Sequence, residues 1–185
     1  MGPFASGPGA CPSCEKGKGL VFRGAVAVCR YEGVAREMVH RFKYGGDTRA
    51  ARWMAGQMAA QWRRAPWGNQ VQVVVPVPLH WSRRIRRRFN QSELLARAMG
   101  REAEARCEPG ILRRTRKTHA QFELSLAERA RNVSGAFRVA RPASVKGQVV
   151  LLVDDVMTTC ATATECARVL RAAGAKRVFV AVFAR

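Results

Sequence analysis

The chain has 185 residues, of which 48% are hydrophobic and 25% are charged. This composition excludes wholesale disorder, and the length suits one domain with a substantial core or a domain with a small appendage. The 33 lysine and arginine residues against 13 aspartate and glutamate residues give a net charge of +20. Such a charge concentrates polyanions near a protein, although a merely soluble, basic surface accounts for the total equally well.

Segments for export or membrane insertion are not expected. No apolar stretch reaches the roughly 18 residues of a membrane span, and the N-terminal residues lack the basic start and apolar core of a secretory signal. The cysteines show no spacing typical of a disulfide framework. We therefore expect a cytoplasmic protein without membrane insertion.

The N-terminal segment contains Cys11 and Cys14 in a CxxC pair. Two thiolates at this spacing supply half of a tetrahedral zinc site, and Cys29 or His40 would have to be recruited from elsewhere to complete it. A remnant site, a redox pair or an incidental spacing are the alternatives to zinc.

Hydrophobic patterning predicts alternating strands and helices along the rest of the chain. Strands are expected at Ala25–Tyr31, Gln70–Pro78, Phe137–Val139, Val149–Val153 and Arg177–Phe183. Helical spacing is expected at Val34–Phe42, Ala51–Trp62, Leu95–Met99, through Arg129 and Asn132, and at Ala163–Leu170. The alternation predicts an α/β domain with a mostly parallel sheet flanked by helices over residues 25–185, preceded by a Cys-bearing appendage over residues 1–24.

Arginines cluster directly beyond the strand expected at Gln70–Pro78. Five of them precede the next helix: Arg83, Arg84, Arg86, Arg87 and Arg88. Guanidinium groups bind phosphate oxygens through two parallel hydrogen bonds, so this position suits a pyrophosphate or a nucleic-acid backbone. A solvated basic loop is the alternative.

A second basic cluster lies in the segment Ile111–Gln121. Its basic residues are Arg113, Arg114, Arg116 and Lys117. We expect this segment to form a mobile loop rather than part of the core. Ser125 with Glu128 fits the S/T-x-x-E capping box, which predicts that a helix starts just after this loop.

The most informative stretch is the expected strand Val149–Val153 and the residues that follow it. Asp154 and Asp155 end the apolar run, and a hydroxyl-rich loop leads to Thr162 and Glu165, which fit a second capping box. In an open α/β sheet, ligands bind beyond the carboxyl ends of strands, and a helix N-terminus offers N–H groups to a phosphate. Carboxylates accept hydrogen bonds from vicinal hydroxyls, so the stretch suits a sugar phosphate. An ordinary strand-to-helix turn is the alternative.

This stretch resembles the ribose-phosphate signature DDxxTTGxT of the type I phosphoribosyltransferases. Its residues are Asp154, Asp155, Val156, Met157, Thr158, Thr159, Cys160, Ala161 and Thr162. The resemblance implies that the two aspartates hold the 2- and 3-hydroxyls of a ribose and that residues 156–162 bind the ribose phosphate. We expect the aspartates to face solvent, so that replacing both by asparagine would remove sugar-phosphate binding and leave the fold intact.

Cys160 departs from this signature, because it stands where the family has glycine. Glycine at such a turn serves either a positive φ or a close approach of the backbone to a ligand, and a side chain obstructs both. We therefore expect Cys160 to weaken phosphate binding. The alternative is an ordinary negative φ with the thiol pointing away from the ligand.

Further blocks resemble one family with this fold, the ComF-like proteins of competence and DNA uptake. They are RYEG at Arg30–Gly33, FKYGGD at Phe42–Asp47, PVPLH at Pro76–His80, RIRRRFNQSELLA at Arg84–Ala96, and Gln121 with Arg129 and Asn132. Two more positions depart from the family pattern. Arg88 replaces a usual glycine, which leaves the shape of the pyrophosphate loop open, and only one CxxC remains of a region that often has two.

The resemblance implies either an enzyme or a binding module. An enzyme would transfer ribose 5-phosphate from phosphoribosyl pyrophosphate, with Mg²⁺ carried mainly on the pyrophosphate near Leu79, His80 and Arg83. A non-catalytic module would use the same fold to hold single-stranded DNA or a nucleotide during DNA uptake, beside a DNA-uptake helicase. The two basic clusters fit either function.

Overall fold

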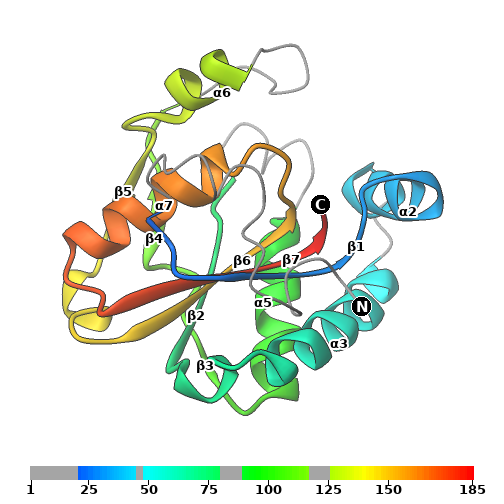
Figure 1. The fold of residues 1–185 in the computed structure, drawn as a ribbon, viewed down its shortest axis with the longest axis horizontal. Helices are drawn as coiled ribbons and strands as arrows, with labels where there is room; N and C mark the ends of the chain where they lie inside the picture. The colour runs from blue at the N-terminus through cyan, green and yellow to red at the C-terminus, as the bar shows by residue number, and fades with distance from the viewer. Residues whose placement is uncertain (1–20, 45–47, 80–88, 117–125) are drawn as a thin grey trace.

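A computed structural model describes residues 21–44, 48–79, 89–116 and 126–185 of the chain (Figure 1). Its centre is a five-stranded sheet with the strand order β1-β7-β6-β2-β3, in which every neighbouring pair is parallel. The strands are β1 (Ala25–Cys29), β2 (Val73–Pro76), β3 (Arg106–Cys107), β6 (Val149–Val156) and β7 (Arg177–Ala184). The expected α/β class with a mostly parallel sheet is therefore confirmed.

Helices cover both faces of this sheet. One face packs against a core that includes residues of α2 (Gly33–Tyr44), α3 (Thr48–Arg64) and α5 (Gln91–Glu102). The other packs against α7 (Ala161–Ala172) and a small antiparallel sheet formed by β4 (Leu112–Arg114) and β5 (Phe137–Val139). Figure 1 shows α3 and α5 on the side of the sheet opposite α7, with α6 (Leu126–Val133) beyond the small sheet. Two short 3₁₀ turns occupy Gly68–Gln70 and Pro142–Ser144.

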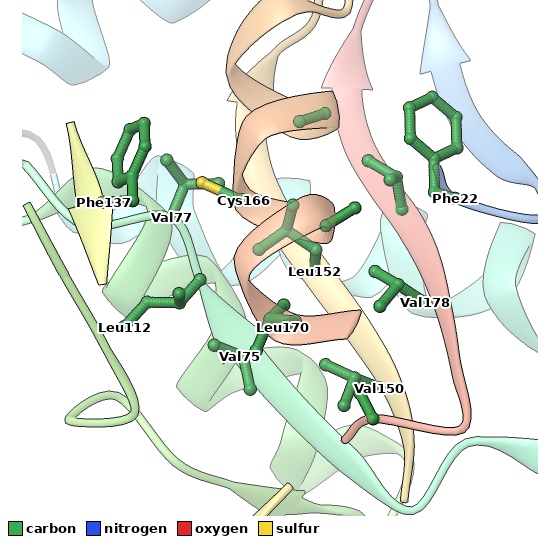
Figure 2. Close-up of a cluster of buried hydrophobic side chains, with 14 of the residues drawn as sticks. Phe22, Val75, Val77, Leu112, Phe137, Val150, Leu152, Cys166, Leu170 and Val178 are labelled. Atoms are coloured by element: carbon green, nitrogen blue, oxygen red, sulfur yellow. The ribbon is translucent and has the colours of Figure 1, made fainter. Parts of the chain in front are cut away.

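Strand β6 lies at the centre of the sheet and contributes to both cores. Val150 and Leu152 pack with the α7 side, where Figure 2 shows them close to Leu170 of α7. Leu151 and Val153 pack with the α3 and α5 side. The prediction of a parallel strand buried on both faces is confirmed, because successive side chains of a strand point to opposite faces and all of these residues are buried.

Other elements match the expectations to within a few residues, but three features differ. The segment expected as a loop from Ile111 begins with strand β4, and Ile111 and Leu112 are fully buried in the core. The edge strand β3 was not expected, since two residues are too few to show a pattern. Strand β6 continues through Val156, so both aspartates belong to the strand rather than following it.

The start of α7 also differs from the expectation. The residue that caps the helix is Cys160, and the helix begins at Ala161, so Thr162 lies inside its first turn. The predicted capping box of Thr162 and Glu165 is therefore wrong. Glu165 instead accepts a hydrogen bond from the backbone N–H of Gly135 at 2.8 Å and pairs with Arg168, which ties α7 to the turn before β5. The other predicted cap residue, Ser125, lies outside the described residues, although α6 does begin at the next position.

The N-terminal boundary remains a prediction, because residues 1–20 lie outside the described part of the chain. Phe22 is buried in the core on the α7 side, and the backbone N–H of Arg23 donates to Val178 of β7. None of the helices that the structure describes is long and apolar enough to cross a membrane.

Candidate functional site

The candidate site lies at the carboxyl end of β6 and in the loop that leads to α7. A pocket with about 290 Å³ of empty space, partly open to solvent, lies there. Its lining residues are Asp154, Val156, Met157, Thr158, Thr159, Cys160, Ala161, Thr162, Ala163 and Val182. The structure thus brings the predicted ribose-phosphate residues together around one hollow, with one exception, Asp155.

Asp154 is held by two donors on the same oxygen. The Ser92 hydroxyl donates to Asp154 Oδ1 at 2.7 Å, and the backbone N–H of Asp155 donates to that oxygen at 2.9 Å. Burial and the neighbouring charge of Asp155 raise the pKa of Asp154 to about 7, although the Ser92 hydroxyl and the charge of Lys43 act in the opposite direction. A carboxylate with this pKa changes its charge near neutral pH.

Asp155 does not face solvent, contrary to the expectation for a residue at a strand's exit. It is only 6% exposed, and its Oδ2 lies 3.2 Å from Nζ of Lys43 near the end of α2. Burial favours the neutral amine of Lys43, but the charges of Asp155 and Asp154 outweigh burial and raise the pKa of Lys43. Lys43 is therefore a cation held inside the site. The expectation that both aspartates can be replaced without cost to the fold is revised accordingly.

The loop from Thr158 to Cys160 supplies the features of a phosphate cradle. The side-chain oxygen of Thr159 is buried, and no described residue forms a hydrogen bond with it. Cys160 adopts a left-handed backbone with φ of 60° and ψ of −4°, which excludes the ordinary negative φ considered above. The loop enters α7, whose first turn presents backbone N–H groups and the positive end of the helix dipole.

The predicted pyrophosphate loop and first basic cluster are largely outside the described residues. Leu79 follows β2, which is the immediate neighbour of β6 in the sheet, so its position is consistent with a role beside the acidic pair. The others lie in segments that the structure does not describe: His80, Arg83, Arg84, Arg86, Arg87 and Arg88. Their predicted roles, like those of Cys11, Cys14 and Lys117, stay predictions.

The second basic cluster is partly used for structure. Arg114 lies on the inner face of the small sheet, with its guanidinium carbon 5.2 Å from the centre of the Phe137 ring. Arg116 donates to the carbonyls of Asn132 and Ser134, so it caps the C-terminal end of α6. Arg113 is exposed. The expectation of one uniform basic loop is therefore wrong for Arg114 and Arg116.

Sequence reasoning missed Lys43 and Ser92 as site residues. Both lie within blocks that carry the family resemblance, FKYGGD and FNQSELLA, but neither residue type suggested a contact with the acidic pair. Their contacts depend on how α2 and α5 pack against the end of β6, which no local pattern encodes.

The described residues do not form a protein-only metal site. No group of three or more His, Cys, Asp or Glu side chains in this part of the chain is placed to hold a metal ion. One oxygen of Asp154 is used by Ser92, and Asp155 is used by Lys43. The donor set therefore fits a magnesium ion that arrives on a pyrophosphate better than one held by the protein alone.

The comparisons with known proteins agree with this geometry. Residues 49–185 match the phosphoribosyl transferase domain family, which defines the class of protein that the sheet and the pocket form. A protein named DNA utilization protein YhgH, from Escherichia coli O6:H1, is 33% identical over 158 residues, covering 84% of this chain and 69% of the relative. Competence protein F from Haemophilus influenzae is 31% identical over 152 residues, covering 80% of this chain and 66% of that protein. The chain belongs to the ComF family of competence and DNA-utilization proteins with a phosphoribosyltransferase domain.

Among solved structures, the chain is similar to glutamine phosphoribosylpyrophosphate amidotransferase from Bacillus subtilis. The two are 27% identical with a TM-score of 0.46, over 70% of this chain and 25% of that chain. The chain thus spans about a quarter of that protein's length.

Proposed function

We propose that the protein binds phosphoribosyl pyrophosphate, or a closely related ribose 5-phosphate, in the pocket at the end of β6. Asp154 would accept a hydrogen bond from a ribose hydroxyl, and the loop from Thr158 to Thr162 would hold the 5-phosphate. Mg²⁺ would arrive with the pyrophosphate and neutralise part of its charge.

The observation that carries the proposal is the buried hydroxyl of Thr159. A buried polar group is normally satisfied, and leaving one unpaired costs about 1–3 kcal/mol. No described residue bonds to Thr159 Oγ1, and the residue lines a pocket that also contains a carboxylate and the start of a helix. A phosphate oxygen would satisfy this hydroxyl.

The site has the charge that ribosyl transfer requires. In that reaction the bond from C1 of the ribose to pyrophosphate breaks, pyrophosphate leaves with the electron pair, and a nucleophile bonds to C1. The ribose becomes cation-like as the bond breaks, so a nearby carboxylate stabilises it. Because the pKa of Asp154 is about 7, this stabilisation grows as pH rises through neutrality. Catalysis also requires an acceptor, and binding is the part of the function that the described residues support.

Calorimetric titration with phosphoribosyl pyrophosphate and Mg²⁺ tests the proposal, with Thr159→Val as the diagnostic variant. Valine has the same shape without the hydroxyl, so we expect stability to hold while affinity falls about tenfold, or 1.4 kcal/mol. Thr164→Val is the matched control, because Thr164 lies in α7 and does not line the pocket. Absence of binding by the wild-type protein, or equal losses in both variants, would contradict the assignment.

Nucleic-acid binding is a second candidate function, favoured by the outer face of the small sheet. Arg113 of β4 lies directly opposite Arg138 of β5, and both side chains are exposed. Like charges directly opposite one another destabilise a strand pair, and within the described residues neither arginine has an acidic partner. A phosphate between the two guanidinium groups would remove this repulsion. The relatives' names refer to competence and DNA utilization, so we propose single-stranded DNA as the ligand and DNA uptake, beside a helicase, as the cellular role.

Fluorescence anisotropy of a labelled oligothymidylate, measured across salt concentrations, tests this second function. Each phosphate contact on a single strand contributes roughly 0.7 to the salt slope of the logarithm of affinity, so Arg113→Gln with Arg138→Gln should lower the slope by about 1.4. The control, Arg52→Gln with Arg64→Gln, removes the same charge from exposed positions on α3, on the opposite side of the sheet. Equal slopes for the two double variants would show that the outer face of the small sheet has no special role.

A further inference from the structure

Lys43 enters the site from a part of the chain far from the ribose-phosphate stretch. It is next to the last residue of α2, and its Nζ lies 3.2 Å from Asp155 Oδ2. Its backbone carbonyl accepts a hydrogen bond from the side-chain amide of Gln91 at 3.3 Å, and Gln91 is only 1% exposed. Phe42, the preceding residue, is fully buried and lies against Phe89 with 6.2 Å between ring centres. The end of α2 is therefore fixed where it delivers an ammonium group to the acidic pair.

Ser92 approaches the pair from the first turn of α5. It is 3% exposed, and its hydroxyl donates to Asp154 Oδ1 at 2.7 Å. That oxygen also accepts from the backbone N–H of Asp155, which leaves no described donor on Oδ2 of Asp154. Because Ser92 follows Gln91 directly, the residues that hold the two carboxylates are linked through adjacent positions of one helix.

The two carboxylates consequently differ in what they offer to a ligand. Asp154 lines the pocket beside the phosphate loop, whereas Asp155 does not line it. Asp155 is buried and paired with Lys43, and removing a carboxylate from an ammonium inside a protein is costly. A ribose hydroxyl competing for Asp155 would have to displace Lys43, whereas a hydroxyl approaching Asp154 displaces nothing among the described residues.

Resting on the proposed function, we propose that Lys43 and Ser92 are positioning residues that give the acidic pair two separate roles. Asp155 serves as the counter-ion of Lys43, and Asp154 is the carboxylate that binds a ribose hydroxyl. Lys43 also keeps the second negative charge compensated, because two adjacent buried carboxylates without a cation would share a proton.

The groups that face the pair come from every element packed around it. Lys43 comes from α2, Ser92 from α5, and Cys166 from α7, while Tyr31 precedes α2 and interacts with Lys43. Burial and the charge of Asp154 raise the pKa of Cys166, so this thiol stays neutral and adds no charge. Lys43 is thus the cation that balances the two aspartates among these groups.

The first test compares wild type with Lys43→Met and with Lys43→Arg, which keeps the charge. Affinity for phosphoribosyl pyrophosphate should rise with pH as Asp154 ionises, and in Lys43→Met this rise should shift upward by about one pH unit, the lower end of the effect of a nearby opposite charge. Lys43→Arg should follow the wild-type profile. Inorganic phosphate, which needs only the loop, should bind wild type and Lys43→Met alike.

The second test separates the two aspartates. Asp154→Asn should weaken binding of phosphoribosyl pyrophosphate at least about a hundredfold, while Lys43→Met combined with Asp155→Asn, which removes both members of the ion pair, should lose less than about tenfold. An equal loss in the two proteins would overturn the division of roles, because it would show that Asp155 also contacts the ribose.

Carbon-13 NMR titration of the aspartate carboxyl groups reads the same proposal without a ligand. The Asp154 signal, assigned by its loss in Asp154→Asn, should titrate at higher pH in Lys43→Met than in wild type. An unchanged titration would refute the role of Lys43 even if phosphoribosyl pyrophosphate binds. Conversely, a shifted titration in a protein that binds no phosphoribosyl pyrophosphate would support the ion-pair arrangement and reject the proposed function.

Discussion

Replacing Cys160 by glycine is the most direct perturbation of the phosphate loop. Cys160 has φ of 60° and ψ of −4°, caps α7 without a side-chain hydrogen bond, and lines the pocket. A side chain in the left-handed region costs about 1–2 kcal/mol relative to glycine. Glycine adds freedom to the unfolded chain, which costs about 0.4–1 kcal/mol, so the net gain in the free energy of unfolding should be about 1 kcal/mol or less.

The effect on ligand binding should be larger than the effect on stability. Because Cys160 lines the pocket at the helix start, its Cβ and Sγ occupy space where a phosphate would approach the backbone N–H groups. We expect Cys160→Gly to tighten binding of phosphoribosyl pyrophosphate about tenfold, or 1.4 kcal/mol. Cys160→Ala keeps the Cβ and the left-handed backbone but removes the sulfur, so it separates the two causes.

Calorimetry across a pH series, with thermal unfolding in parallel, provides the measurement. Wild-type affinity should fall as the thiol ionises, because a thiolate repels the phosphate, whereas the glycine and alanine variants should show no such step. If Cys160→Ala matches Cys160→Gly, the sulfur is the obstacle, and if it matches wild type at low pH, the backbone and Cβ are. Equal affinities for all three proteins at every pH would refute the reasoning, and the departure from the family signature would then be silent.

Three further predictions follow from the acidic pair, the first basic cluster and the CxxC pair. Asp154→Asn combined with Asp155→Asn should abolish binding of phosphoribosyl pyrophosphate and also lower the free energy of unfolding by about 3 kcal/mol, because Lys43 loses its counter-ion; unfolding in urea checks this, and an unchanged midpoint would show that the ion pair is weak. Replacing the arginines at positions 86–88 by glutamine should flatten the salt dependence of single-stranded DNA binding by roughly one unit per phosphate contact, and a wild-type slope would mean that they are only solvated. Zinc should be weak and substoichiometric by elemental analysis, because one CxxC supplies two of four ligands, and a full equivalent surviving dialysis against chelator would contradict this.

The sheet and the pocket loop could be predicted because their signals are local. The run Val149–Val153 alternates between two buried faces, and Gly174, with φ of 93°, ends the last helix as its sequence position suggests. The prediction ended β6 too early because charged side chains were taken as its limit. Hydrogen bonding in a strand uses the backbone alone, and the register of β6 against β7 continues to Val156 opposite Ala184.

The burial of the acidic pair could not be predicted, because it depends on groups brought together by the fold. A buried carboxylate is unfavourable unless it is paired or hydrogen-bonded, so two adjacent aspartates at a strand end are reasonably expected to face water. The packing of α2 and α5 against this end of the sheet changes that balance by supplying Lys43 to Asp155 and Ser92 to Asp154. One carboxylate is then compensated within the protein and the other keeps an oxygen toward the pocket. The same packing that makes burial tolerable therefore determines which aspartate is left for a ligand.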